Sequence, residues 1–138
     1  MIINGENLIL GRLATIAAKK ALLGEKIDVI NCEKVVISGK RKEILSRYKE
    51  KAQIKGELKG PYLSKTPDRF VRRSIRGMLP YKQYRGEKAF KKIMCHIGTP
   101  DKLKDQKQET LKEARMGNLR ITNTITVKEV CQQLKKWK

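Results

Sequence analysis

The sequence is poor in the residue types on which many small binding and catalytic sites depend. Aromatic side chains make up only 5% of the 138 residues, which is too few and too scattered for a platform that stacks single-stranded bases. Cys32, Cys95 and Cys131 are odd in number and far apart, so neither a disulfide framework nor a zinc module is indicated. We expect each cysteine to be packed as a small hydrophobic residue. His96 is the only histidine and has no obvious triad or metal partner nearby in sequence, so we expect it to lie in the core.

Long hydrophobic runs and phosphate-binding loops are also missing. No stretch approaches the roughly 20 apolar residues that a membrane span needs, and the N-terminus lacks a basic segment followed by a sustained apolar one. An intracellular soluble protein without a membrane partner is therefore expected. The segment from Gly5 to Gly11 lacks the Lys and Ser/Thr of a phosphate loop, and no G-x-G-x-x-G follows the first strand. We therefore expect no nucleotide cofactor, and we interpret Gly11-Arg12 as a helix entrance.

Catalytic groups are equally hard to find. The acidic residues are spread among lysines, so no pair of catalytic carboxylates and no metal-binding cluster can be picked out. The sequence therefore predicts no catalytic residue, no metal, no cofactor and no small-molecule substrate. A binding role is favoured over an enzymatic one.

Basic residues, in contrast, are abundant and unevenly distributed. The chain has 33 Lys and Arg against 14 Asp and Glu, a net charge of +19 and a pI near 10.1, which makes a polyanion the expected partner. Residues 40–92 carry 18 basic and 5 acidic side chains, whereas residues 1–39 are nearly neutral. We predict that the segment 40–92 holds the partner site.

Within this segment a helix is predicted to begin at Pro67. Thr66 could cap it, proline suits the first helical position, and Asp68 suits the positive helix end. We expect Gly77 to end the helix in a left-handed conformation and Pro80 to prevent its continuation.

The helical period divides this helix into two faces. Val71, Ile75 and Met78 fall on one face. The opposite face carries four arginines, which are Arg69, Arg72, Arg73 and Arg76. A solvated face is the alternative, but such faces normally mix both signs of charge, whereas four like charges repel one another unless an anion lies against them. Guanidinium forks also match phosphate oxygens well, so we favour polyanion binding.

The other segments alternate between strands and helices. Apolar runs at 1–4, 27–30, 35–37 and 93–97 predict four strands, and the first two flank a helix over 10–23 that Gly24 closes. A second helix is predicted from Lys40 toward Lys55, burying Ile44, Leu45, Tyr48 and Ala52. Arg85-Gly86 is interpreted as a turn before another short helix.

The C-terminal third is predicted to be a polar extension with a helix at its end. Residues 101–118 are mostly polar, so we expect an excursion along a partner's surface rather than core. The residues TVKE from Thr126 form a capping box. The helix that follows carries an apolar stripe of Val127, Val130, Cys131 and Leu134, and Trp137 would pin the tail.

Together these elements predict an α/β fold. We expect three layers, α/β/α, around a mostly parallel four-stranded sheet, with basic loops and a C-terminal helical extension. The core domain is predicted over residues 1–100, with the basic segment 40–92 inside it, and the extension over residues 101–138.

The residues 74–86 read SIRGMLPYKQYRG and resemble the signature region of the large-subunit ribosomal L-thirteen family. Supporting matches are LGRLA from Leu10, Leu23-Gly24, NCEK from Asn31, and Ser38-Gly39. The resemblance extends from about Ile2 to Pro100 and more loosely to the end, and it fits an archaeal-type member.

This resemblance implies a function as well as a fold. It implies a Rossmann-like sheet that binds no dinucleotide, and a structural, non-catalytic role in which the protein binds large-subunit ribosomal RNA, supports subunit assembly and contacts neighbouring large-subunit proteins in the cytoplasm. Arg76, Gly77, Lys82, Arg85 and Gly86 lie in the signature, whereas Arg69, Arg72 and Arg73 are candidates because of the shared helix face. The full set of RNA-binding candidates is Lys59, Lys65, Arg69, Arg72, Arg73, Arg76, Gly77, Lys82, Arg85, Gly86, Lys88, Lys91 and Lys92.

Two other classes remain open at this stage. A nucleic-acid-processing enzyme would share the charge but should bring clustered acids for a metal. A DNA-packaging protein would share the charge without so apolar a sheet or so localised a basic segment.

Overall fold

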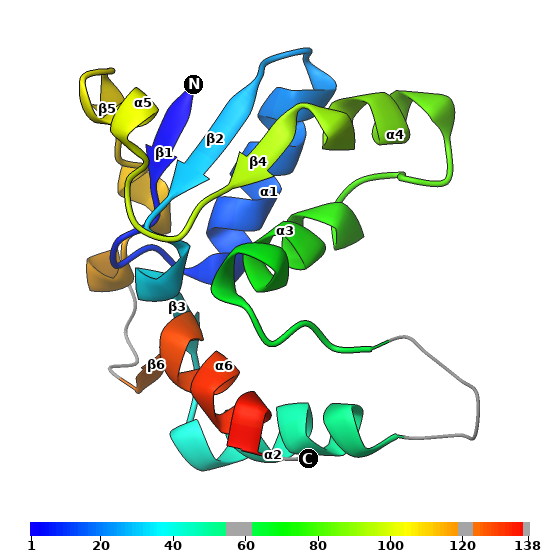
Figure 1. Cartoon of the computed structure of the whole chain (residues 1–138), viewed down its shortest axis with the longest axis vertical. Helices are drawn as coiled ribbons and strands as arrows, with labels where there is room; N and C mark the ends of the chain where they lie inside the picture. The colour runs from blue at the N-terminus through cyan, green and yellow to red at the C-terminus, as the bar shows by residue number, and fades with distance from the viewer. Residues whose placement is uncertain (55–61, 119–122, 137–138) are drawn as a thin grey trace.

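The computed structural model describes residues 1–54, 62–118 and 123–136, and Figure 1 shows their arrangement. The strands are β1 (Ile2–Asn4), β2 (Ile27–Ile30), β3 (Val36–Ser38), β4 (Ile93–Cys95), β5 (Gln108–Glu109) and β6 (Thr124–Thr126). The α-helices are α1 (Leu10–Leu22), α2 (Arg41–Gln53), α3 (Pro67–Gly77), α4 (Tyr84–Lys91), α5 (Asp101–Lys104) and α6 (Val127–Lys136). Short 3-10 turns are η1 (Cys32–Lys34), η2 (Lys112–Ala114) and η3 (Met116–Asn118).

The main sheet has the strand order β4-β2-β1-β5, and every neighbouring pair is parallel. The crossover from β1 to β2 is α1, which lies behind the sheet in Figure 1, while α3 lies below β4 and beside α1. The apolar runs on β1, β2 and β4 supply fully buried residues such as Ile3, Val29 and Ile93. This arrangement confirms the predicted α/β class, with layers around a parallel four-stranded sheet and a C-terminal helix.

The identity of one sheet strand differs from the sequence prediction. The apolar pattern predicts the run at 35–37 in the main sheet, but β3 pairs antiparallel with β6, where Ile37 lies opposite Ile125. The fourth place is taken by β5, which pairs with β1. Both residues of β5 are exposed, so this strand joins the sheet through its backbone and leaves no apolar pattern to read.

The prediction of a purely external excursion over residues 101–118 is therefore wrong in part. Besides β5, Ala114 in η2 is fully buried in the core, and its carbonyl accepts a hydrogen bond from the Ile9 N–H at 2.8 Å. Most other residues of this segment are exposed, as expected.

Helix α1 ends as predicted. Gly24 has a φ of +103°, which favours glycine. Its N–H donates to the Ala21 carbonyl at 3.0 Å and the Glu25 N–H donates to the Lys20 carbonyl at 3.2 Å, which is the hydrogen-bond pattern of a Schellman motif. Helix α2 also forms as predicted, with Ile44 buried and Leu45, Tyr48 and Ala52 partly buried, while Lys55 lies outside the described residues.

Helix α6 packs into the same buried core as the sheet. Its predicted stripe of Val127, Val130, Cys131 and Leu134 is buried, and in Figure 1 α6 lies beside α2 and β6. Thr126 caps the helix by accepting a hydrogen bond from the Glu129 N–H at 3.3 Å. The Glu129 carboxylate pairs with Arg41 of α2, so this acid links two helices. The predicted role of Trp137 lies outside the described residues, and the domain division at residue 100 stays a prediction.

The prediction for the cysteines is confirmed, whereas the prediction for the histidine is wrong. All three cysteines are free and buried, as predicted. Desolvation by burial raises the pKa of Cys131 to about 11, and a hydrogen bond with Cys32, followed by burial, raises the pKa of Cys95. The expectation for His96 is wrong, because its side chain is 28% exposed and its Nε2 lies 3.3 Å from Asp28 Oδ1. The pairing of β2 with β4 brings this acid beside His96 from 68 residues away.

Candidate nucleic-acid interface

Helix α3 begins at Pro67, as predicted, and buries Phe70, Val71 and Ile75. The Thr66 hydroxyl does not cap the helix as expected, but lies 3.2 Å from the Ser64 hydroxyl. The expected left-handed Gly77 is also wrong, since Gly77 is the last residue of the right-handed helix and Met78 follows in a right-handed conformation. Because the chain leaves the helix there, Leu79 is buried and the Met78 side chain, expected inside, is 50% exposed.

The four arginines of α3 lie on one face, as the helical period predicts. Arg69, Arg72, Arg73 and Arg76 line a pocket of about 360 Å³ together with Tyr62, Ser64 and Phe90. We call these four residues the arginine face and the hollow they line the arginine pocket. Tyr62 and Ser64 precede α3, and Phe90 comes from α4, so the pocket is built by three segments.

Two of these guanidinium groups lie over aromatic rings, and a third donates to a backbone carbonyl. Arg72 Cζ lies 4.5 Å from the centroid of the Phe90 ring, and Arg76 Cζ lies 4.8 Å from that of Tyr81. Arg73 donates from NH1 to the Tyr62 carbonyl at 3.0 Å. Arg69 is exposed. Among the described residues no carboxylate forms an ion pair with any of the four arginines.

Arg72 is partly buried, like Arg73 and Arg76. Its Nε is buried and has no hydrogen-bond partner among the described residues, and the same holds for Asp68 Oδ1 one turn earlier in α3. A cation stacked on an aromatic ring with a buried stem is fixed in position. Arg72 therefore differs in its role from the exposed Arg69.

The second half of the predicted surface is α4 and the turn before it. Lys82 and Arg85 are exposed. The prediction of a turn at Arg85-Gly86 is wrong, because both residues belong to the first turn of helix α4. The chain changes direction earlier, at residues 80–83, where the Gln83 N–H donates to the Pro80 carbonyl at 2.9 Å. Gly86 is buried. A Cβ added to this residue would lie only 2.1 Å from the Pro80 carbonyl oxygen, so the position has no room for a side chain.

The remaining lysines predicted to bind RNA differ in the contacts that they make within the protein. Lys91 pairs with Glu87 at 2.8 Å, and this hydrogen bond lowers the pKa of Glu87 and raises that of Lys91. Lys92 donates to the Gly24 carbonyl at 2.8 Å, which ties the end of α4 to the end of α1. Lys88 Nζ lies 6.0 Å from the Tyr84 ring centroid, and Lys65 is exposed. Lys59 lies outside the described residues.

The comparison with known families agrees with this picture. The sequence model of the family described as ribosomal protein L13 matches residues 1–102. The chain belongs to the ribosomal protein L13 family. It is similar to large ribosomal subunit protein uL13 of Methanosarcina barkeri, at 42% identity over 96% of both chains. It is also similar to uL13 of Methanopyrus kandleri, at 41% identity over 96% of this chain and 85% of the relative, and to that of Archaeoglobus fulgidus, at 37% over 96% and 86%.

Family membership confirms the resemblance found in the sequence. The relatives named above are archaeal, as predicted. L13 proteins are structural components of the ribosome in the cytoplasm and not enzymes, so the predictions of a ribosomal location and of no catalytic role are confirmed. In the part of the chain that the structure describes, no helix is long and apolar enough to cross a membrane.

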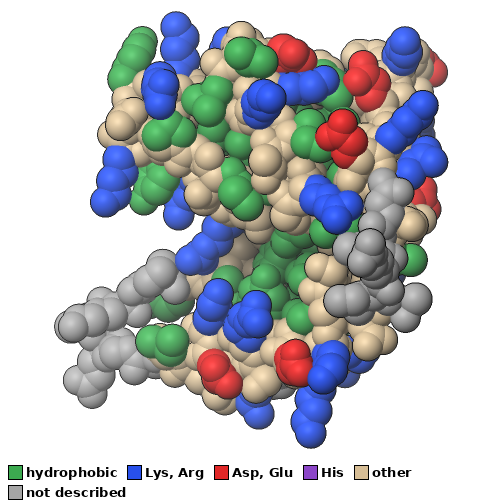
Figure 2. Space-filling view, turned by 180° about the vertical axis from the view of Figure 1, so that it is seen from behind, with side chains coloured by type: hydrophobic (Ala, Val, Ile, Leu, Met, Phe, Trp, Pro, Cys, Tyr) green, Lys and Arg blue, Asp and Glu red, His purple; other side chains and the backbone are tan. Residues whose placement is uncertain are grey.

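A second groove in this L13 chain was missed by sequence reasoning. It measures about 710 Å³ and lies between α1, β3 and the end of α3; among the residues that line it are Gly11, Arg12, Ser38, Ser74, Gly77 and Met78. Figure 2 shows the molecule hollowed between its upper and lower parts, with hydrophobic side chains on the floor and Lys and Arg at the edges. One local signal was present, since Gly11-Arg12 is interpreted from the sequence as the entrance to α1, and both residues lie in the first turn of that helix.

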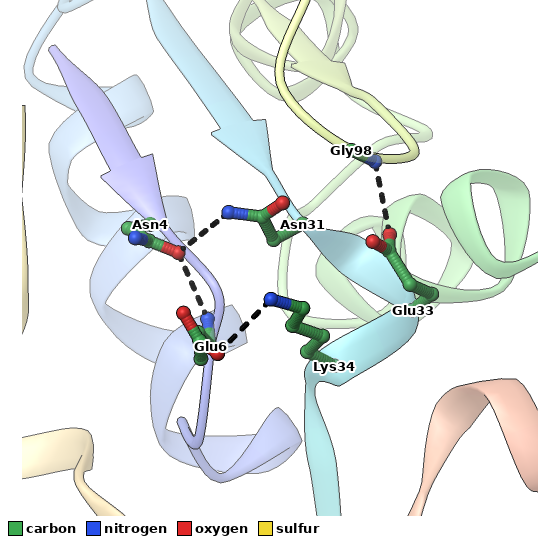
Figure 3. Close-up of polar contacts among 6 residues, drawn as sticks. All are labelled: Asn4, Glu6, Asn31, Glu33, Lys34 and Gly98. Carbon is green, nitrogen blue, oxygen red and sulfur yellow. Dashed lines mark hydrogen bonds and ion pairs between the residues drawn. The ribbon is translucent and has the colours of Figure 1, made fainter.

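The carboxyl edge of the parallel sheet, where α/β folds commonly bind nucleotides, is bridged by the protein's own polar groups. Figure 3 shows Asn4 Oδ1 accepting hydrogen bonds from Asn31 Nδ2 at 3.0 Å and from the Glu6 N–H at 3.1 Å. Lys34 pairs with Glu6 at 3.0 Å, and Glu33 accepts from the Gly98 N–H at 3.0 Å. These contacts join the segments that follow β1, β2 and β4. The absence of a bound dinucleotide stays a prediction.

Proposed function

We propose that this chain binds large-subunit ribosomal RNA through the arginine face, and that it supports assembly of the subunit as a structural constituent beside neighbouring large-subunit proteins. The observation that carries the proposal is that four guanidinium groups line one pocket while none has an acidic partner among the described residues. Similarity to relatives named large ribosomal subunit protein supports the choice of large-subunit RNA as the partner.

The arrangement suits a phosphate backbone for electrostatic reasons. Four like charges on one helix face destabilise the free protein, and an RNA backbone would relieve that repulsion. The net charge of +19 supplies a long-range attraction. Arg69 is exposed. Among the described residues Arg73 donates through NH1 only, which leaves its other donors for phosphate oxygens.

The proposed surface includes all the predicted residues within the segment 40–92, but with unequal roles. Exposed Lys65, Lys82 and Arg85 would extend the interface along the backbone. Lys91 and Lys92 also make contacts within the protein, so their contribution to RNA affinity should be smaller. Gly77 and Gly86 would act through the backbone, Gly86 by letting α4 pack against Pro80.

The test is the salt dependence of RNA affinity. Removing one phosphate-binding side chain should flatten the slope of log affinity against log salt concentration by roughly 0.7 to 0.9. Replacing Arg69 and Arg73 with Ala should therefore flatten the slope for a large-subunit RNA fragment by between about one and two units. Replacing both with Lys should keep most of the slope but lower the affinity, because the charge stays while the planar guanidinium fork is removed.

A matched control removes the same charge elsewhere. Lys128 and Lys136 are exposed on α6, and their replacement with Ala should change the slope less than the arginine variant does. Thermal stability of the arginine variant should be unchanged or higher, since repulsion along α3 is relieved. If that variant unfolds several degrees earlier with its salt slope unchanged, the arginines are internal structural partners and the proposed RNA face is wrong.

A further inference from the structure

We propose that the arginine pocket holds an unpaired RNA base stacked against Arg72, with the other arginines of the face holding the flanking phosphates. This inference rests on the proposed function and makes it more specific. A bound duplex backbone alone would need only a basic surface, whereas the structure has a pocket with an aromatic residue in its wall.

The shape of the site is the first argument. The pocket measures about 360 Å³, within the range of roughly 300 to 1,000 Å³ of small-molecule sites and so large enough for a single nucleotide. Phosphates of a regular duplex lie on a convex surface and would meet the rim of such a hollow. An extruded nucleotide is the part of an RNA that can enter it.

The position of Arg72 is the second argument. Its guanidinium lies over the Phe90 ring at 4.5 Å, and both residues line the pocket. Its Nε is buried, so the stem is fixed and the fork has little freedom to follow a mobile phosphate. A fixed guanidinium plane backed by an aromatic ring is a surface on which RNA-binding proteins stack unpaired bases.

The neighbouring groups fit the two phosphates of such a nucleotide. Arg73 is held by the Tyr62 carbonyl and Arg76 by the Tyr81 ring, so both guanidinium groups are preorganised. Arg69 is exposed beside them, and Ser64 adds a hydroxyl to the pocket wall. An acidic peptide could pair with these arginines, but it would have no use for a stacking surface, and for this reason we favour the nucleotide.

The experiment compares RNA hairpins of equal sequence that differ at one position. One hairpin is fully paired, the second carries a bulged adenosine, and the third carries an abasic nucleotide at the bulge. The bulged adenosine should bind about tenfold more tightly than the other two, because removal of one base–side-chain stack typically costs roughly five- to hundredfold in affinity. The abasic hairpin has the same backbone charge, so it isolates the base.

Variants then assign the effect to the pocket. Phe90→Leu and Arg72→Lys keep the net charge, and each should remove the preference for the bulged adenosine while leaving the salt slope unchanged. Tyr84→Leu is the matched control, since Tyr84 lies on the same helix, is 78% exposed and does not line the pocket. It should keep the preference. Because Phe90 packs against the core, thermal unfolding identifies any loss of fold, and Arg72→Lys then provides the test.

The outcomes separate the inference from the proposed function. Equal affinity for all three hairpins, with the salt slope still dependent on Arg69 and Arg73, overturns the base pocket and leaves RNA binding intact. A preference that survives both Phe90→Leu and Arg72→Lys also overturns it. A salt slope that does not depend on Arg69 and Arg73 contradicts the proposed function itself.

Discussion

The absence of a side chain at Gly86 allows α4 to lie close to the turn that precedes it. Gly86 is buried in the first turn of α4, and a Cβ there would lie 2.1 Å from the Pro80 carbonyl oxygen and 2.9 Å from the Tyr81 nitrogen. These are backbone atoms, which cannot move aside as a side chain can. The close approach holds α4 against the turn that leads from α3, and so holds Phe90 beside Arg72.

We therefore expect Gly86→Ala to destabilise the free protein. Overpacking typically costs about 1 to 3 kcal/mol, which exceeds the roughly 0.5 to 1 kcal/mol that alanine gains over glycine in a helix. Urea unfolding measures the difference, and RNA affinity should fall with it because α4 is displaced.

Gly77→Ala is the control for this change. Gly77 lies at the end of α3 in a right-handed conformation, and a Cβ there would meet nothing within 4 Å. Its replacement should leave the free energy of unfolding unchanged or raise it by up to about 1 kcal/mol. Equal loss of stability in both glycine variants would contradict this account of Gly86.

At the residue scale, the sequence predicts that the arginines share one helix face, but it does not predict the aromatic residues that contact them. The 3.6-residue period is local, so the shared face of Arg69, Arg72, Arg73 and Arg76 can be derived without a structure. The aromatic residues are too scattered along the chain to indicate a site. Folding of the chain brings Phe90 of α4 over Arg72 of α3. Such contacts depend on tertiary structure that no local pattern encodes.

At the scale of elements, the first turn of α6 is both capped and tied to another helix. Thr126 accepts a hydrogen bond from the Glu129 N–H, and the Glu129 carboxylate reaches Arg41 on α2. Of the two hydrogen bonds of the predicted capping box, the one from the Glu129 N–H to the Thr126 hydroxyl is present. The Glu129 carboxylate, which would make the other, pairs with Arg41 on α2 instead. The cap is part of the fold and lies outside the proposed RNA surface.

Thr126→Ala should lower the free energy of unfolding by roughly 0.5 to 2 kcal/mol, toward the lower end because the hydrogen bond is long, at 3.3 Å. Hydrogen exchange of the α6 amides should become faster, while RNA affinity stays nearly the same. Thr124→Ala, two residues earlier on the same strand, controls for removal of a threonine that caps no helix. A tenfold loss of RNA affinity without faster exchange in α6 would show that the cap region binds RNA.

Strand pairing was the least predictable feature at this scale. The apolar run of β3 carries no sign that its partner is β6, near the other end of the chain, where Val36 lies opposite Thr126. The polar strand β5 carries no sign of being a strand at all, because its side chains are exposed and only its backbone joins β1. Helix bounds were predicted better, since caps and periodicity are local signals.

Across the whole molecule, one buried core supports the arginine face from behind. Phe70, Val71 and Ile75 of α3 belong to the same core as the sheet and α6. The guanidinium groups are therefore presented by a helix that is anchored in the core. The overall charge and the family signature made the ribosomal role predictable, whereas the pocket depends on three segments that meet only in the folded chain.

The most direct test of the central claim is to map ultraviolet cross-links between this chain and ribosomal RNA in intact large subunits. Mass spectrometry of the digested complex identifies the peptides that carry a nucleotide. We predict cross-links within residues 62–92, centred on α3 and the first turn of α4. Cross-links confined to α2, α6 or the exposed side of β5, with none in residues 62–92, would contradict the assignment of the arginine face to RNA.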